Sequence, residues 1–147
     1  AGVKLMGSFR NTFLSFAGGS CDAAKWKPYF SEYQADVWDA EGDGVLQFHA
    51  DDGKEYSLVI VHWSGVGFLL QLACRNLTTN RSEWCKFSVS DRNRLDQFEE
   101  RDDLHYPVGC FLSPTDAWPA VEDFLSQPTQ PSSRIGWIDD AEVSWPE

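Results

Sequence analysis

The stretch VLQFHADDGKEYSLVIVHW, residues 45–63, decides the fold. Residues 45–50 and 55–63 are rich in β-branched and aromatic side chains, and they flank the turn Asp51-Asp52-Gly53-Lys54. An Asp-Gly pair between two such runs is a strong hairpin signal. The second run is apolar on both faces, which places it in the centre of a sheet.

The turn also predicts a register for the two strands. If two residues occupy the turn centre, Leu46 faces Val59 and Phe48 faces Ser57. The same register sets Asp43 opposite His62. There we expect an ion pair or an orienting contact, because a solvated cross-strand pair is the commoner case than a catalytic dyad.

Strand patterns continue on both sides of this hairpin. The runs at residues 9–16, 68–75, 83–89, 106–112 and 135–138 predict further strands, with a short one at 143–145. The charged stretch 90–103 is expected to be a loop or a short helical turn, anchored by Leu95 and Phe98. Short polar turns between the central runs predict an antiparallel meander.

Two helices are expected to pack on this sheet. Aromatic residues at helical spacing, with Pro28 tolerated near the start, predict the first over residues 28–36. The second begins after the N-cap residue Ser113, has an acidic residue at Asp116, and ends before Pro128. Its core-facing positions are Ala117, Ala120, Val121, Phe124 and Leu125. The expected fold class is α+β, an antiparallel β-sheet meander with an N-terminal and a C-terminal helix packed on it.

The size and composition fit one domain. The chain has 147 residues, of which 42% are hydrophobic and 14% aromatic, enough for a sizeable core. Its single methionine, Met6, indicates that residues 1–5 are a cloning remnant before a natural start, so the domain is expected to span residues 6–147. With no apolar run of spanning length and no apolar secretory core, we expect a cytoplasmic protein without membrane contact.

The four cysteines are expected to be thiols in a reducing compartment. Cys21, Cys74, Cys85 and Cys110 are scattered, without the spacing of zinc ligands. When residues 68–75 pair with 81–88, Cys85 lies opposite residue 71 and not opposite Cys74, which argues against a cross-strand disulfide. The sequences Asn76-Leu77-Thr78 and Asn80-Arg81-Ser82 match the glycosylation sequon and keep secretion open as an alternative.

The charge balance excludes one class of partner and favours another. The chain has 23 acidic residues against 12 basic ones, a formal net charge of -11. A field of this sign repels phosphate backbones, so we expect no direct binding of nucleic acid. A basic protein is favoured, since opposite fields accelerate encounter by roughly 10- to 1000-fold at low salt.

Catalytic signatures are missing from the sequence. His49, His62 and His105 have no metal-ligand spacing, and there is no serine-nucleophile elbow, phosphate loop or dinucleotide-binding glycine pattern. A thiol nucleophile from Cys110 with His105, or from Cys85 with His62, competes with the commoner buried cysteine. We therefore expect no catalytic residue, no metal and no cofactor, and no enzyme activity.

Two acidic segments, residues 36–52 and 99–103, remain as candidate binding surfaces. They are interleaved with tryptophans, and interfaces concentrate their energy in such anchors while charge steers the approach. A weak cation site in residues 36–43 is a lesser alternative, because the ligand order of a calcium loop is missing. The candidate partner-binding residues are Asp36, Trp38, Asp39, Glu41, Asp43, Asp51, Asp52, Trp63, Glu99, Glu100, Asp102 and Asp103. The sequence does not choose between the two segments.

The last forty residues carry a pattern with a family resemblance. It comprises VGCFLSPTDA at 108–117, VEDFL at 121–125 and RIGW at 134–137. The pattern resembles the C-terminal signature of the first-numbered immunity protein family of bacterial polymorphic toxin systems. The matching positions are Ser113, Ala117, Ala120, Phe124 and Trp137. Pro119 and the closing Trp-Pro depart from the pattern, and the first hundred residues offer a compatible β-rich region without a motif.

The resemblance implies a function without chemistry of its own. An immunity protein binds a cognate toxin as a heterodimer and covers its active site, and toxins paired with this family often are deaminases or nucleases. Such active sites tend to be basic because they attract phosphate, so an acidic inhibitor would match them. The alternatives are a small carboxylate-dependent hydrolase and a secreted carbohydrate- or protein-binding module.

Overall fold

The computed structural model describes residues 6–12, 21–41 and 44–146. The strands are β1 (Gly7–Asn11), β2 (Gly44–Ala50), β3 (Lys54–Trp63), β4 (Gly67–Asn76), β5 (Arg81–Val89), β6 (Phe98–Arg101), β7 (Leu104–Pro107), β8 (Phe111–Leu112) and β9 (Gly136–Asp139). The α-helices are α1 (Ala23–Ser31), α2 (Ala35–Glu41) and α3 (Pro114–Ser126), and 3₁₀ turns lie at Arg92–Arg94, Val108–Cys110 and Asp140–Glu142. The expected remnant at residues 1–5 lies outside the described residues.

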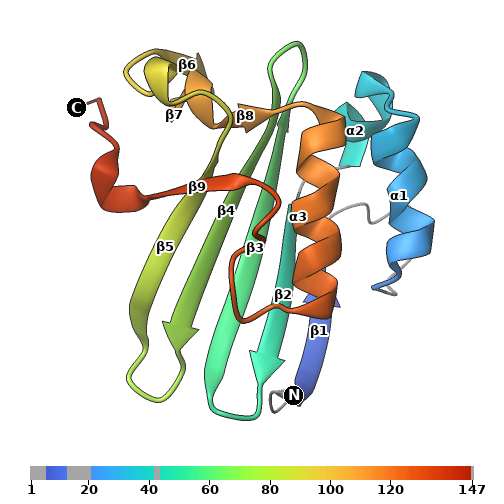
Figure 1. Ribbon diagram of the computed structural model, residues 1–147, viewed down its shortest axis with the longest axis vertical. Coiled ribbons are helices and arrows are strands. Elements are labelled where there is room, and N and C mark those ends of the chain that lie inside the picture. Colours follow the sequence, from blue (N-terminus) through green and yellow to red (C-terminus); the bar gives the residue numbers. More distant parts are fainter. Residues whose placement is uncertain (1–5, 13–20, 42–43, 147) are drawn as a thin grey trace.

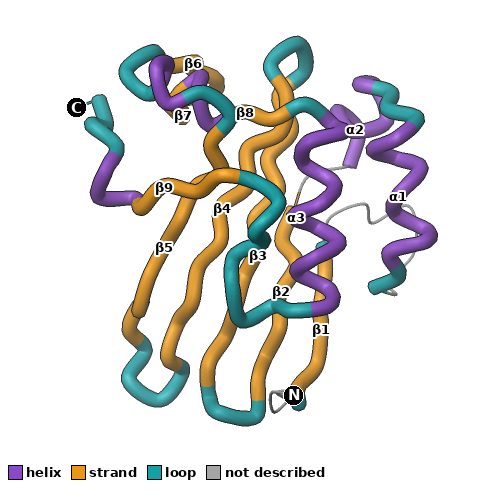
Figure 2. The backbone as a smooth tube through the Cα atoms, in the orientation of Figure 1, coloured by secondary structure: helices purple, strands orange, loops and turns teal. Residues whose placement is uncertain are grey.

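The main sheet is antiparallel and the fold is α+β, as predicted. Its strand order is β1-β2-β3-β4-β5-β9, and β8 pairs with the start of β4. Consecutive strands β2 to β5 are neighbours, which makes the expected meander (Figure 1). The helices α1 and α3 lie side by side over one face of this sheet (Figure 2).

The register of the β2–β3 hairpin corrects our prediction by one residue. Leu46 lies opposite Leu58, and Phe48 lies opposite Tyr56. The loop contains three residues, because Gly53 takes a φ of 84° and its N–H donates to the carbonyl of Ala50. A left-handed glycine closing a three-residue loop is the next commonest hairpin after the two-residue turn. This register sets buried side chains opposite buried ones, as a one-sided core requires.

The β4–β5 pairing also differs in detail. Cys85 lies opposite Ala73, and Cys74 lies opposite Trp84, so the predicted partner of Cys85 was wrong. The expectation that Cys74 and Cys85 do not form a cross-strand disulfide is confirmed, since all four cysteines are free. A register shift between Cys74 and Arg75 accounts for part of the difference.

The predicted helix over residues 28–36 is two helices. The side chain of Asp22 caps α1 by accepting from the N–H of Ala24, so the helix starts before the proline and Pro28 lies inside it. The turn that follows still closes, because the N–H of Glu32 donates to the Pro28 carbonyl over 2.8 Å. The chain then leaves helical geometry before α2 begins.

The region after β5 is more ordered than expected. The 3₁₀ turn at Arg92–Arg94 agrees with the predicted short turn, but β6 and β7 then form a separate two-stranded sheet. The predicted strand 106–112 is interrupted at Gly109, where an added Cβ would lie 2.1 Å from the Asp91 carbonyl oxygen. The predicted strand at 143–145 is absent, and Val143 and Trp145 pack in the core there instead.

Two hydrophobic clusters cover opposite faces of the sheet. The larger one joins α1, α2 and α3 to alternate residues of β2, β3 and β4 such as Leu46, Leu58 and Leu70. The smaller one, around Leu69 and Phe87, is covered by the β6–β7 hairpin and the C-terminal segment. The predicted core face of α3 is confirmed at Ala117, Ala120, Val121 and Phe124, which are buried, while Leu125 is partly buried.

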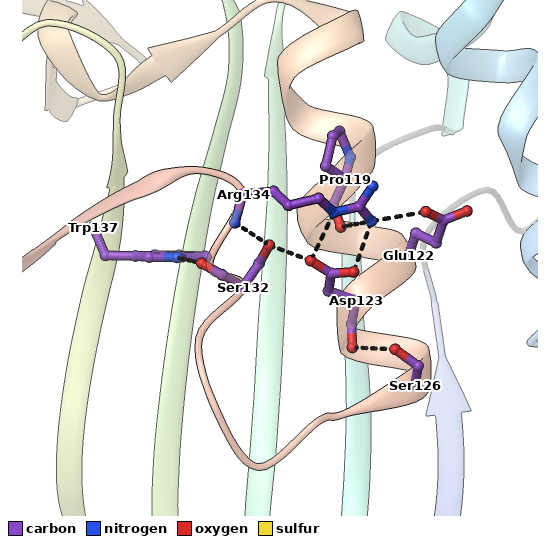
Figure 3. Close-up of polar contacts among 7 residues, drawn as sticks. All are labelled: Pro119, Glu122, Asp123, Ser126, Ser132, Arg134 and Trp137. Carbon is purple, nitrogen blue, oxygen red and sulfur yellow. Dashed lines mark hydrogen bonds and ion pairs between the residues drawn. The ribbon is translucent and has the colours of Figure 1, made fainter.

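A polar network fixes the C-terminal segment to α3 (Figure 3). The Arg134 guanidinium donates to Asp123, to Glu122 at 2.7 Å and to the Pro119 carbonyl at 3.1 Å. Ser132 donates to the same Asp123 carboxylate, and the Trp137 indole N–H donates to the Ser132 carbonyl. The Ser113 hydroxyl accepts from the Asp116 N–H, which confirms the predicted N-cap of α3.

Candidate functional site

The predicted acidic residues lie at two opposite ends of the sheet. The helix α2 ends just before β2 begins, and β6 follows the end of β5, so both lie at the end that carries the β3–β4 turn (Figure 1). The Asp51-Asp52 turn joins β2 to β3 at the other end. The first predicted segment is therefore divided, and only its α2 part lies at the same end of the sheet as residues 99–103.

We call the first of these ends the acidic end. Its carboxylates come from α2 and from the β6–β7 hairpin, which lie about sixty residues apart in the sequence. They are the exposed side chains of Asp36, Asp39, Glu100, Asp102 and Asp103 and the half-buried Glu99. Asp39 of α2 and Arg101 of β6 contact neighbouring residues of β3, His62 and Trp63.

The β6–β7 hairpin presents its two acidic turn residues at its tip. Asp102 and Asp103 have φ values of 52° and 66°, as in the two-residue turn that fits the twist of a hairpin and that Gly, Asn and Asp adopt more readily than other residues. Behind them, the Arg101 Nη2 donates to the Ser64 carbonyl over 2.6 Å. Its guanidinium also lies over the Trp63 ring. These contacts hold the hairpin against the β3–β4 turn.

The helix α2 is tied to β3 through a buried histidine. The Asp39 Oδ1 lies 3.3 Å from Nδ1 of His62, whose side chain is fully buried. The Tyr33 hydroxyl is hydrogen-bonded to His62 Nε2. Burial, and then the charge of Asp39, raises the pKa of Tyr33, so its phenol stays protonated. His62 thus lies beside Asp39, whereas Asp43, the partner predicted for it, lies outside the described residues.

Burial corrects the two predicted tryptophan anchors. Trp38 is 1% exposed and Trp63 is 8% exposed, so neither can enter a partner's surface as a protruding side chain. Trp38 packs edge-on against Phe30 and Phe68, and Trp63 packs against Phe111. The sequence made them attractive as anchors because both stand beside charged or polar residues, but the strand and helix geometry turns their rings inward.

Asp51, Asp52 and Glu41 are the remaining predicted site residues. Asp51 and Asp52 are exposed, but at the far end of the sheet. Glu41 ends α2, and its side chain is among the parts not described. The lesser cation hypothesis involves Asp36, Asp39, Glu41 and Asp43. Among the described residues, no three His, Cys, Asp or Glu side chains form a group that could hold a metal ion.

The histidines and cysteines are not arranged as nucleophile and base. The three histidines lie next to carboxylates, namely Glu55 for His49, Asp39 for His62 and Glu100 for His105. Burial raises the pKa of all four thiols, to about 11 at Cys110. A raised pKa removes the thiolate on which nucleophilic attack depends. The Cys-His alternatives therefore find no support in the geometry.

Among the described residues, Glu83 and Asp123 have a lowered pKa. A hydrogen bond from Lys54 lowers the pKa of Glu83, and one from Arg134 lowers that of Asp123. A general acid in a glycosidase-like site needs the opposite shift. Neither residue belongs to the acidic end, so their charges serve local structure.

The contacts of Arg101 and Tyr33 escaped sequence reasoning. Both residues belong to segments that we expected to be a loop or the middle of a helix, so no partner was assigned to them. The polar pair Glu32 and Gln34 on either side of Tyr33 could have signalled the break between α1 and α2.

Comparisons with known proteins give no family assignment for this chain. No family model matches the chain, and no curated protein or solved structure matches it either. Within the described residues, no helix is long and apolar enough to cross a membrane.

Proposed function

We propose that the protein is an immunity protein that binds a cognate bacterial toxin and occludes its active site with the acidic end. The toxin is a basic, nucleic-acid-targeting domain, a deaminase or a nuclease. In this proposal the protein acts in the cytoplasm, as a monomer that forms a heterodimer with the toxin, and it has no catalytic activity and no direct contact with nucleic acid.

One observation carries the proposal. Two acidic segments distant in the sequence, on α2 and on the β6–β7 hairpin, lie at one end of the sheet. Arg101 is the one arginine or lysine within β6 and β7, and its Nη2 is bonded to the Ser64 carbonyl. The exposed carboxylates of the hairpin therefore face solvent with little local neutralisation. Such a surface can replace phosphate in a basic cleft and steer the approach of its partner.

The C-terminal resemblance adds indirect support. The matching residues act in packing, as the resemblance implies. Ser113 caps α3, and the α3 residues Ala117, Ala120 and Phe124 are buried in the core. Trp137 fixes the connector through its bond to the Ser132 carbonyl. These residues build the scaffold that positions the acidic end and do not form part of it.

The alternatives are less well supported. A carboxylate-dependent hydrolase needs a carboxyl group with a raised pKa in a pocket, and the shifted carboxyls move the other way. A secreted binding module of this size would be expected to use disulfides, but the four cysteines are free.

The test uses two matched double substitutions. The partner is the toxin domain encoded by the reading frame immediately upstream. Asp102→Asn/Asp103→Asn removes two charges from the hairpin tip of the acidic end, and Asp51→Asn/Asp52→Asn removes two charges from the hairpin turn at the other end. Asparagine tolerates the positive φ at 102 and 103, so the first variant keeps its turn.

Association rates are measured for both variants at low and at physiological salt. We expect the first variant to associate about tenfold more slowly at low salt, with a weaker salt dependence, and the second to match the wild type. Equal effects of the two variants, or none, would contradict an acidic-end interface. Failure of the wild-type protein to bind and inhibit the toxin domain would reject the immunity function itself.

A further inference from the structure

A pocket of about 300 Å³ opens between α1 and α2. Its lining residues are Pro28, Tyr29, Glu32, Gln34, Val37 and Trp38. The volume is many times the roughly 30 Å³ that one water occupies in the liquid, so the pocket has room for a side chain. It adjoins the acidic end, because α2 contributes both Asp36 and the pocket residues Val37 and Trp38.

The floor of the pocket is the C-terminal end of α1. The last carbonyls of a helix carry a partial negative charge, which is stabilised by a cation nearby. The last turn of α1 contains no basic residue. Two of its carbonyls are already engaged by neutral donors, at Pro28 by the Glu32 N–H and at Tyr29 by the Trp38 indole N–H over 3.0 Å. A positive charge here would be stabilised by a negative helix end whose last turn contains no lysine or arginine.

The walls of the pocket favour the same kind of guest. Glu32 is exposed at its rim, and among the described residues no cationic side chain forms an ion pair with it. Tyr29 is half-buried and supplies aromatic surface, and the face of an aromatic ring attracts a cation. Charge, helix end and ring thus point to a cationic group with a flat apolar side.

The geometry points to an arginine side chain of the protein partner as the occupant of this pocket. The guanidinium is planar, stacks on aromatic rings, and presents several donors that match carboxylate and carbonyl oxygens. Arginine is also one of the residues in which interfaces concentrate their binding energy. This inference rests on the proposed function for the identity of the partner, but the chemistry of the pocket stands on the chain alone.

The sequence indicated that Trp38 anchors this protein in its partner, whereas the pocket indicates that the partner anchors itself in this protein. Trp38 does not protrude into the partner, because it is buried. It forms the inner wall of a receptor for the partner's side chain, next to carboxylates of the acidic end that steer the approach.

The test needs no toxin. N-acetyl-arginine amide is titrated into the purified protein and followed by two-dimensional NMR of backbone and indole N–H groups. The neutral isostere N-acetyl-citrulline amide and N-acetyl-lysine amide are titrated in parallel. Three variants are compared with the wild type. Glu32→Gln removes the charge at the rim, Gln34→Trp fills the pocket at an exposed position, and Asp51→Asn removes one charge at the far end of the sheet.

We expect saturable shifts at Tyr29, Glu32, Val37 and the Trp38 indole with the arginine probe, and none with citrulline. Glu32→Gln should weaken the binding about tenfold, Gln34→Trp should abolish it, and Asp51→Asn should leave it unchanged. Equal binding of arginine and citrulline, shifts outside the pocket, or no saturable binding would overturn the inference. Tighter binding of the lysine probe would overturn the choice of a guanidinium.

The two proposals fail in different experiments. Arginine binding to the isolated protein without inhibition of the toxin domain would reject the immunity function and leave the pocket's chemistry intact. Toxin inhibition that Glu32→Gln and Gln34→Trp leave unchanged would show that the partner does not use the pocket, and would overturn the inference alone.

Discussion

The guanidinium carbon of Arg101 lies 5.5 Å from the centre of the Trp63 ring. The same side chain donates to the Ser64 carbonyl, so one residue of β6 contacts both the end of β3 and the turn that follows it. This relationship holds the β6–β7 hairpin, and with it half of the acidic end, against the main sheet.

Replacement of Arg101 should loosen the hairpin. We expect Arg101→Ala to lower the free energy of unfolding by about 1 to 2 kcal/mol, because one charged hydrogen bond and one cation–ring contact are lost. Urea denaturation measures the loss, and hydrogen exchange should locate it at β6 and β7. Arg94→Ala is the control, since Arg94 is exposed and its guanidinium donates to the exposed Gln97 side chain over 3.3 Å. A loss of equal size in both variants would contradict the special role of Arg101.

Substitution of the two residues at the hairpin tip should raise the stability of the protein and weaken its binding to the toxin. Asp102→Asn/Asp103→Gly introduces the Asn-Gly pair that this turn type prefers, and we expect it to raise the free energy of unfolding by about 1 kcal/mol. The same substitution removes two charges from the acidic end, so binding of the toxin should weaken. A variant that is more stable but binds less well would show that the two carboxylates are retained for binding and not for stability. Parallel changes of stability and affinity would argue against this.

The Asp123 carboxylate should give α3 a pH-dependent anchor. Its pKa lies below the ordinary 3.8 because Arg134 donates to it, so its contribution to stability is present above that value and is lost as the pH falls through the lower value of the folded state. Asp123→Asn should therefore destabilise the protein at neutral pH, and the difference from the wild type should shrink below about pH 4. Urea denaturation across pH 3 to 7 measures it.

The control for this pH dependence is the same substitution in a protein that lacks Arg134, the hydrogen-bond donor to Asp123. In an Arg134→Gln background, the effect of Asp123→Asn should lose most of its pH dependence, because the hydrogen bonds that lower the pKa are gone. An unchanged profile would assign the shift to another group.

The thiols should be present but slow to react. Burial raises the pKa of Cys110 to about 11 and raises that of the other three cysteines, so little thiolate forms at pH 8. We expect Ellman's reagent to modify the native protein slowly and to titrate four thiols once it is unfolded, without any reductant. Fewer than four thiols would support a secreted form with a disulfide, and fast modification of one native thiol would reopen the thiol-nucleophile alternative.

Local patterns in the sequence predicted the parts that local physics controls. The N-cap at Ser113, the buried face of α3 and the hairpin at 45–63 depend on hydrogen bonds and on side-chain periodicity within one or two elements. The one-residue error in the hairpin register shows the boundary of that reasoning. The conformation of Gly53 set the loop length, and the alternation of buried residues in β2 and β3 would have corrected it.

The acidic composition and the identities of the acidic residues come from the sequence alone, and so does the choice of a basic partner. Only the tertiary structure decided where these charges go. The direction in which β2 and β5 run carries α2 and the β6–β7 hairpin to one end and leaves Asp51 and Asp52 at the other. The same packing buried Trp38 and Trp63, because a ring between a sheet and its covering elements gains more from leaving water than from protruding into it. Long-range packing therefore turned two expected anchors into core and opened a pocket beside one of them.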